Sequence, residues 1–225
     1  MATDALKLVE ALLKAQMHEG PGSSAGKPVI TVSRDYGSGG REISGHLARR
    51  LGIPVYDKEL LDAVAERSGI DPKLMAQLDE RTRGFWDAWI SSLMSGEEML
   101  EAKHRHYLVK VVLGILNTGN GGVIIGRGAH IILARQDVFR VRIIASPQTC
   151  AERVAAKRAV SVEEARKLVE QVNQGREKFI REVFKQRLNE PAAFDLTINT
   201  DRLSKYEEVA EIIILAMQYR HRNNA

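Results

Sequence analysis

Five short apolar runs, each leading into a segment of helical periodicity, set the pattern of this chain. The segments that follow the runs repeat apolar residues at spacings of three and four, which is typical of helices that pack on a sheet. Strands that alternate with helices predict an α/β fold with a mostly parallel sheet covered on both faces. The runs, which we interpret as strands, are residues 29–32, 53–57, 123–125, 139–146 and 195–200.

The first strand leads into a glycine-rich turn and then a helix. Residues 33–40 read SRDYGSGG, and Ile43, Leu47 and Leu51 then fall on one helical face, with Gly52 placed to end the helix. Such a turn is typical of a phosphate cradle, because its N–H groups point inward and the helix N-terminus adds positive charge. An ordinary connection between a strand and a helix has the same features, so both interpretations stay open on the loop alone.

The turn departs from the usual P-loop pattern, G-x-x-x-x-G-K-[ST]. With Gly39 on the second glycine, Arg34 falls on the first, Gly40 on the lysine and Arg41 on the Ser/Thr. The loop therefore lacks the lysine that normally reaches the β- and γ-phosphates and the hydroxyl that normally binds Mg²⁺.

Polar and charged residues follow two of the other strands. Asp57 ends the second strand, where it either faces a ligand at the carboxyl edge of the sheet or caps the helix over residues 58–69. Arg127 follows the third strand between Gly126 and Gly128. There it either grips a phosphate with its planar guanidinium or is a surface arginine in a turn.

The C-terminal part of the chain reads as three helices around the last two strands. Ser161 and Glu164 form a capping box that opens a charge-rich helical stretch over residues 161–188. Before this stretch, Pro147 begins another helix, whose residues Ala151, Val154 and Ala155 are expected to face the protein core. In the closing helix over residues 204–218, the side chains expected to face the sheet are Val209, Ile212, Ile213 and Met217.

The N-terminal segment reads as a separate amphipathic helix over residues 3–17. Its apolar stripe consists of Leu6, Val9, Leu13 and Met17, widened by Leu12. The linker PGSSAGKP at residues 21–28 joins it to the first strand. Either the helix packs on its own domain or it is a contact for a homodimer or another partner. We therefore divide the chain into this segment, residues 1–28, and an α/β domain, residues 29–220.

Composition and charge narrow the classes of partner. The hydrophobic fraction of 44% and the charged fraction of 28% are those of a globular protein, and no run of 18 apolar residues predicts a membrane span. Charges interrupt the N-terminal apolar residues, so no signal peptide is expected. The single cysteine, Cys150, allows no internal disulfide and fits a cytoplasmic protein.

The net charge of +4 is mild, and most of it lies in residues 151–190, which hold ten Lys/Arg and seven Glu. A local excess of this size suits a small phosphate-bearing ligand, although a solvated helical face explains any one of these charges. Nucleic-acid binding is not expected, because the aromatic fraction is only 5% and no larger basic patch with aromatics occurs. In the helical region over residues 71–118, Trp86 and Trp89 read as core or interface packing, and His104 and His106 are too poorly spaced for a metal pair.

Four stretches together resemble the cytidylate-kinase-like family, relatives of the bacterial CMP kinases: ITVSRDYGSGGREI, LGIPVYDKELL, VIIGRGAHIIL and FDLTINTDRLS. The resemblance covers roughly residues 29–217, and a loop without the usual lysine is a common form in that family. It implies a P-loop kinase-like three-layer fold with a five-stranded parallel sheet in the order 2-3-1-4-5. It further implies a helical acceptor-binding region over residues 58–120 and a lid region over residues 151–190.

The resemblance also implies an activity and the residues that serve it. The activity is transfer of the γ-phosphoryl group of ATP, with Mg²⁺, to CMP, dCMP or a similar monophosphate. Donor-phosphate residues would be Arg34, Gly37, Ser38, Gly39, Gly40 and Arg41, with Arg41 as the cation in place of the lysine. The lid would contribute Arg176 and Arg181 to catalysis. The acceptor would be held by Asp57 and Arg127, and the base by Asn199 and Thr200. The metal would be held by Ser38, or by Glu42 through water.

Two alternatives remain beside this hypothesis. The missing lysine favours a catalytically weak or inactive nucleotide-binding or regulatory module. CMP kinases have a GRD motif at residues 126–128, and Gly128 leaves any role of its aspartate unfilled. A kinase for another small metabolite fits the same pattern. The retained arginines favour an enzyme over a module.

Overall fold

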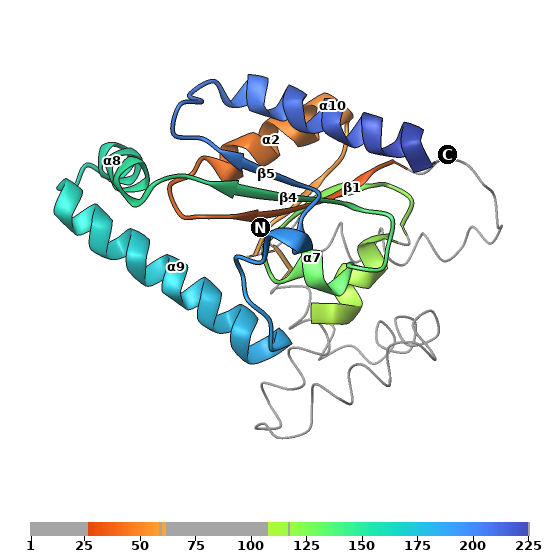
Figure 1. Cartoon of the computed structure of the whole chain (residues 1–225), viewed down its shortest axis with the longest axis horizontal. Helices are drawn as coiled ribbons and strands as arrows, with labels where there is room; N and C mark the ends of the chain where they lie inside the picture. The colour runs from red at the N-terminus through yellow and green to blue at the C-terminus, as the bar shows by residue number, and fades with distance from the viewer. Residues whose placement is uncertain (1–26, 59, 62–107, 117, 225) are drawn as a thin grey trace. The chain divides into compact units, whose positions relative to one another are not determined.

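The computed structural model describes residues 27–58, 60–61, 108–116 and 118–224 (Figure 1). The chain forms two compact units, one from residues 1–29 and 56–122 and the other from residues 30–55 and 123–225. The N-terminal helix, the tryptophan and histidine pairs and most of the acceptor-binding region lie outside the described residues. The loop and the arginines singled out above lie in the second unit.

Five strands form one sheet in the order β2-β3-β1-β4-β5, as predicted. The second strand is shorter than expected because Pro54 has no N–H to donate to a ladder; its carbonyl instead accepts from Val123 at 2.9 Å. Strand β4 pairs in parallel with both β1 and β5, so the carboxyl ends of these strands share one edge of the sheet. The strands are β1 (Val29–Arg34), β2 (Val55–Tyr56), β3 (Gly122–Ile125), β4 (Phe139–Ile144) and β5 (Leu196–Asn199).

The helices begin and end where the sequence provides caps. Gly52 adopts a left-handed conformation and donates its N–H to Ala48, which ends α2 as predicted. Ser161 and Glu164 form the predicted capping box at the start of α9. The helical elements are α2 (Gly40–Leu51), α7 (Ala129–Ile132), α8 (Pro147–Arg158), α9 (Val162–Phe184), the short 3₁₀ turn η1 (Pro191–Ala193) and α10 (Tyr206–Asn224).

Helices α2 and α10 lie together on one side of the sheet, and α7 and α9 lie on the other (Figure 1). The main core fills the α2 and α10 side and contains Ile30, Val32, Ile43, Leu47, Val141, Ile143, Val209, Ile213 and Met217. The prediction for Ile212 is wrong, because 45% of its surface is exposed. The buried face of α10 follows residues 209, 213 and 217 together with 210 and 214, and position 212 lies outside that arc.

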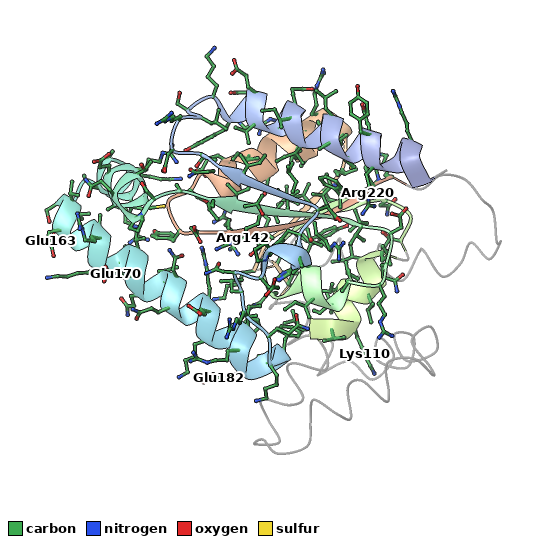
Figure 2. The ribbon with its side chains drawn as sticks, in the orientation of Figure 1. Lys110, Arg142, Glu163, Glu170, Glu182 and Arg220 are labelled. Carbon is green, nitrogen blue, oxygen red and sulfur yellow. The ribbon has the colours of Figure 1, made fainter. Side chains whose placement is uncertain are left out.

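The α7 and α9 side of the sheet carries polar side chains. Thr31, Ser33 and Arg142 are all buried, and Figure 2 shows Arg142 inside the protein, whereas Glu163, Glu170 and Glu182 project outward from α9. A second, smaller core joins α8 to α9 through Cys150, Ala151, Val154, Ala155, Ala165 and Val169. The three alanine and valine positions predicted to be buried on α8 are therefore confirmed.

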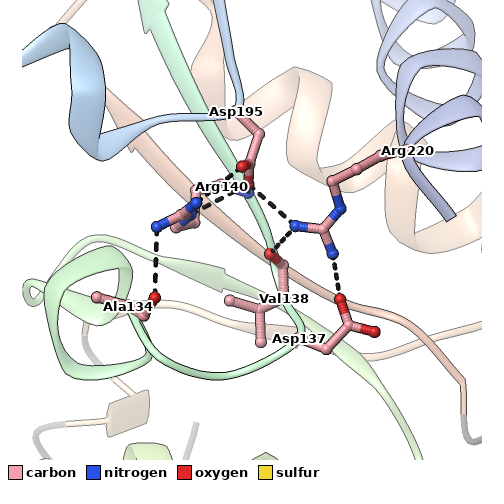
Figure 3. Close-up of polar contacts among 6 residues, drawn as sticks. All are labelled: Ala134, Asp137, Val138, Arg140, Asp195 and Arg220. Carbon is pink, nitrogen blue, oxygen red and sulfur yellow. Dashed lines mark hydrogen bonds and ion pairs between the residues drawn. The ribbon is translucent and has the colours of Figure 1, made fainter. Parts of the chain in front are cut away.

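An ion-pair network ties the N-terminal end of β4 to the start of β5 and to α10 (Figure 3). Arg140 binds both carboxylate oxygens of Asp195, at 2.8 and 3.1 Å, and Arg220 contacts Asp195 at 3.4 Å and also pairs with Asp137. Burial alone would raise the pKa of Asp195, but the hydrogen bonds and charge of Arg140 bring that pKa below its ordinary value. This network stands at the edge of the sheet opposite the glycine loop, so we assign it to stability.

Candidate functional site

The glycine loop joins β1 to α2 and leaves the start of α2 without a side-chain cap. Gly39 occupies the cap position in a left-handed conformation, with φ of 82°, and has no side chain that could accept a hydrogen bond. The first intrahelical bond runs from the N–H of Ile43 to the carbonyl of Gly39 at 3.0 Å. The amides of Gly40, Arg41 and Glu42 precede that bond, so this helix end has the geometry that suits an anion.

Two of the glycines are required by close packing. Gly37 has a φ of 91°, and a Cβ placed on it would lie 2.6 Å from the carbonyl oxygen of Cys150 in α8. A Cβ on Gly39 would fall onto the ring of Tyr206, at the start of α10. The loop is therefore held between α8 and α10, and only glycine fits at these two positions.

Arg34 occupies the space beside the residue that aligns with the missing lysine. A Cβ on Gly40 would lie 2.6 Å from Cβ and 2.9 Å from Cγ of Arg34, and a Cβ on Gly126 would overlap the Arg34 Nη1 atom. The stem of Arg34 thus lies against the first residue of α2, and its guanidinium reaches the carboxyl end of β3. Arg41, by contrast, is exposed on the first turn of α2.

The two residues predicted as metal ligands are engaged in other contacts. Ser38 is fully buried, and its hydroxyl lies 3.0 Å from the carbonyl of Asp35 and 3.2 Å from that of Ile143. Glu42 pairs with Lys157 at 2.5 Å; burial raises its pKa, but the lysine and backbone hydrogen bonds outweigh this and the pKa is lowered. No cluster of three metal-ligating side chains occurs within the described residues, and both metal roles stay predictions.

Helix α9 contacts the loop directly. The Asn173 Oδ1 atom accepts the N–H of Tyr36 at 2.8 Å, and Arg176 donates to the carbonyl of Arg34 at 2.9 Å. Burial lowers the pKa of Arg176, while the nearby Asp35 carboxylate opposes that effect. Of the two predicted lid arginines, the fold brings Arg176 to the loop. Arg181 is exposed five residues further along α9, on a different face of the helix.

A buried ion pair beneath the loop was not predicted from the sequence. Arg142 of β4 contacts the Asp35 carboxylate at 2.5 Å and the Asn189 side chain at 2.8 Å, and it is only 4% exposed. The signal was present in the run FRVRII, where arginines alternate with apolar residues in a central strand. Because parallel strands are covered on both faces, an arginine there requires a buried acceptor.

Arg127 follows β3 as predicted, in a left-handed conformation with φ of 53° between two left-handed glycines. Its guanidinium lies over the ring of Phe179 in α9, 4.9 Å from the ring centroid, and its Nε atom is buried without a hydrogen-bond partner among the described residues. A Cβ on Gly128 would collide with Phe184, so α9 packs tightly against this turn. Arg127 and the Arg34 guanidinium therefore both stand at the carboxyl end of β3.

Of the two residues predicted to hold a base, Thr200 is buried and Asn199 is exposed. Thr200 is fully buried, and its hydroxyl lies 2.9 Å from the carbonyl of Ser38 and 3.0 Å from Arg153 Nη1. Asn199 is exposed, and its side chain accepts the N–H of Asp201 at 2.9 Å. Thr200 thus supports the loop from below, and its role toward a base stays a prediction, as does that of Asn199.

Asp57 belongs to the first unit, where its carboxylate accepts the N–H of Leu60 at 3.0 Å. This is the contact of a helix cap, one of the two roles that the sequence left open. Its other role, toward an acceptor, stays a prediction.

The second unit therefore combines the uncapped N-terminus of α2 with three arginines, which are Arg34 of β1, Arg127 of the turn after β3 and Arg176 of α9. Such an arrangement favours binding of a phosphate group, because guanidinium groups and helix amides both donate hydrogen bonds to anionic oxygens. None of the helices in the described part of the chain is long and apolar enough to cross a membrane.

The fold is similar to that of a solved bacterial protein. The crystal structure of an uncharacterised protein from Eubacterium ventriosum is 20% identical, with a TM-score of 0.69 over 86% of this chain and 99% of that chain. A shikimate kinase from Acinetobacter baumannii, solved with shikimate, is 17% identical, with a TM-score of 0.47 over 86% and 94% of the two chains. No curated protein matches the sequence.

The family comparison covers the elements that build the site. The model of the cytidylate kinase-like family matches residues 29–202, from the first residue of β1 through the glycine loop, α9 and β5. Since this match includes most of the sequence and every strand of the sheet, the chain belongs to the cytidylate kinase-like family.

Proposed function

We propose that the protein is an ATP-dependent phosphotransferase that transfers the γ-phosphoryl group to a small phosphate-bearing acceptor, with CMP and dCMP as its substrates. The observation that carries the proposal is the position of Arg34 against the uncapped N-terminus of α2 in a member of this family. It supplies a cation beside the residue that aligns with the missing lysine.

Phosphoryl transfer requires positioned reactants and neutralised charge more than a covalent nucleophile. The amides at the start of α2 would hold the donor phosphates, with Arg34 as the main cation and Arg41 at the outer rim. Arg176 would add charge from α9, and Arg127 would turn from Phe179 to the acceptor phosphate. Mg²⁺, when bound with ATP, would neutralise part of the charge of the donor phosphates, and Ser38, or Glu42 through water, would be its ligand from the protein.

A coupled assay of ADP release tests the activity on the full chain. The assay contains Mg²⁺, ATP and, in separate reactions, CMP, dCMP, UMP or AMP. We expect ADP release that depends on CMP or dCMP and exceeds that with AMP. Turnover with none of the four monophosphates would contradict the proposed acceptor class.

A nucleotide-binding module without turnover is the second candidate function. It is favoured by Ser38 and Glu42, whose side chains are engaged in contacts within the protein rather than presented to a metal. Titration calorimetry separates the two functions, because a module would bind ATP in a sample that releases no ADP with any acceptor.

Arg34→Ala should weaken ATP binding about ten- to a hundredfold, because a charge-assisted contact contributes roughly 1.5–3 kcal/mol. The substitution keeps the backbone carbonyl that Arg176 contacts, so the loop should stay in place. Alanine keeps the Cβ of residue 34, which would lie 2.6 Å from a Cβ at position 40, so the rescue variant is Arg34→Gly/Gly40→Lys, and it should recover much of the lost affinity. Titration calorimetry measures both effects.

Arg41→Ala is the matched control for that experiment, since it removes the exposed arginine of the same loop. We expect a smaller loss of affinity than for Arg34→Ala. A larger loss would return the role of the missing lysine to Arg41, the cation predicted from the sequence.

Arg127→Lys should raise KM for the monophosphate or lower kcat about tenfold while ATP affinity stays near that of the wild type. A lysine keeps the charge but loses the planar fork that binds two phosphate oxygens at once. Steady-state kinetics with CMP varied at saturating ATP measures the change. Unchanged kinetics would remove Arg127 from the acceptor site.

A further inference from the structure

An apolar stripe runs along the outer side of α10, away from the core. Ile212, Leu215 and Tyr219 expose 45%, 53% and 62% of their surface, although neighbouring residues of the same helix are buried. Such large apolar side chains, aligned on one helix face, are typical of a surface that meets another protein.

The stripe continues into a charged residue at each end. Together, Glu208, Ile212, Leu215, Tyr219 and Arg222 are spaced by four, three, four and three residues. This is the spacing of a seam along which two helices pack side by side. The sheet does not use this seam, because α10 packs on the main core through Val209, Ile213 and Met217.

We propose that this seam, residues 208, 212, 215, 219 and 222, binds the same seam of a second copy of the chain, with the two α10 helices antiparallel. The charges of Glu208 and Arg222, at the two ends of the seam, are the reason for choosing a second copy of the chain as the binding partner. Glu208 lies seven residues before Leu215 and Arg222 lies seven residues after it, so a two-fold axis at Leu215 brings each Glu208 opposite the partner's Arg222.

The same charges exclude a parallel pair. In a parallel arrangement Glu208 would face its own copy, as would Arg222, and both like-charge contacts would be unfavourable. Within one chain Glu208 contacts Lys205 at 2.9 Å, and Arg222 lies 5.6 Å from the ring of Tyr219. Both side chains are exposed at the helix surface, where these weak local contacts exchange readily for contacts across an interface.

The oligomeric state of the full chain tests the proposal. Light scattering over a concentration series should approach twice the chain mass of 25.1 kDa. Leu215→Glu, which places two carboxylates at the axis, should give the single-chain mass at every concentration. Val160→Glu is the matched control, because Val160 is a similarly exposed apolar residue, at 41%, outside the seam, and its variant should still dimerise. A single-chain mass for the wild type at all concentrations would overturn the proposal.

Charge exchange tests the antiparallel register. Glu208→Arg and Arg222→Glu should each raise the dimer dissociation constant about fivefold or more, and the double variant should restore it. No recovery in the double variant would rule out this pairing.

Leu13→Glu, in the N-terminal segment, should leave the dimer intact. Loss of the dimer in that variant, with retention in Leu215→Glu, would assign the interface to residues 3–17.

Cysteine cross-linking locates the axis. The native Cys150 is buried, so a new surface cysteine is the main reactive thiol. Leu215→Cys should form an interchain disulfide on mild oxidation, because position 215 faces its own copy at the axis. Position 219 is more exposed, but Tyr219→Cys should form no interchain disulfide. Each cysteine would lie four residues from the axis at position 215, on opposite sides of it, so about 12 Å along the helices would separate the two thiols. Equal cross-linking of both variants would contradict the register.

Discussion

Gly37→Ala should destabilise the protein by roughly 3 kcal/mol. The left-handed backbone alone costs an alanine about 1–2 kcal/mol. The new Cβ would also lie 2.6 Å from the carbonyl oxygen of Cys150, and a backbone atom cannot move aside as a flexible side chain could. Urea unfolding of the wild type and the variant measures the difference in free energy.

Gly175→Ala is the matched control, because the same change occurs in the middle of α9 with no atom within 4 Å of the added Cβ. We expect it to stabilise the protein by about 0.5–1 kcal/mol, since alanine restricts the unfolded chain and favours the helix. A loss of stability in both variants would show that the chain tolerates no added methyl group, and the argument from Cys150 would fail.

The packing around Gly37 also shows why the loop could be predicted from the sequence only in part. The strand, the glycine-rich turn and the helix are local features, and their positions in the structure agree with the prediction. The neighbours that hold the loop are remote in sequence: Asn173 contacts it across 137 residues and Thr200 across 162. No local pattern encodes such contacts, because they depend on how α9 and β5 are placed by the sheet.

The arginines of the site were likewise predicted from the sequence only in part. Arg176 was predicted as a catalytic arginine of the lid. The fold brings it to the loop, where it contacts the carbonyl of Arg34, and its catalytic role stays a prediction. Arg142 was missed because a strand was assigned from its apolar residues, and the buried acceptor that an arginine needs was not sought. Arg41 was chosen over Arg34 as the replacement cation because it lies at the start of the predicted helix. Position along the chain does not show that the stem of Arg34 lies against Gly40 in space.

Ile212 illustrates a limit of periodicity. Residues 209, 212, 213 and 217 satisfy a helical repeat, yet so do residues 208, 212, 215, 219 and 222. A helix with two overlapping apolar patterns carries two surfaces, and only the fold determines which one the sheet buries. The exposed fraction of Ile212 decides that point for α10.

The protein should lose stability between pH 6.5 and pH 4 through a single buried histidine, His130. The ring stacks on Phe194 with centroids 4.7 Å apart, and its Nε2 atom has no hydrogen-bond partner among the described residues. Burial, and to a lesser extent the positive charges of Arg142 and Arg140, lower the pKa of His130 to about 4. The folded state therefore keeps this ring neutral at a pH where the unfolded chain protonates it.

The sign follows from proton binding. Below the ordinary pKa of 6.5 the unfolded chain binds a proton that the folded state refuses, so the free energy of unfolding falls as the pH falls and levels off near pH 4. The difference between the pKa of 6.5 in the unfolded chain and about 4 in the folded state corresponds to about 3 kcal/mol of stability.

His130→Phe keeps a ring against Phe194 but cannot bind a proton. Urea unfolding at pH 7 and pH 4.5 should therefore show a smaller loss of stability at the acid pH for this variant than for the wild type. His130→Gln should do the same, which guards against poor packing of the larger ring. His46→Gln, a partly exposed histidine beside Glu207, should keep the wild-type acid loss. Equal acid losses in all four proteins would mean that other groups, such as the paired carboxylate of Asp195, control the acid limit of the fold.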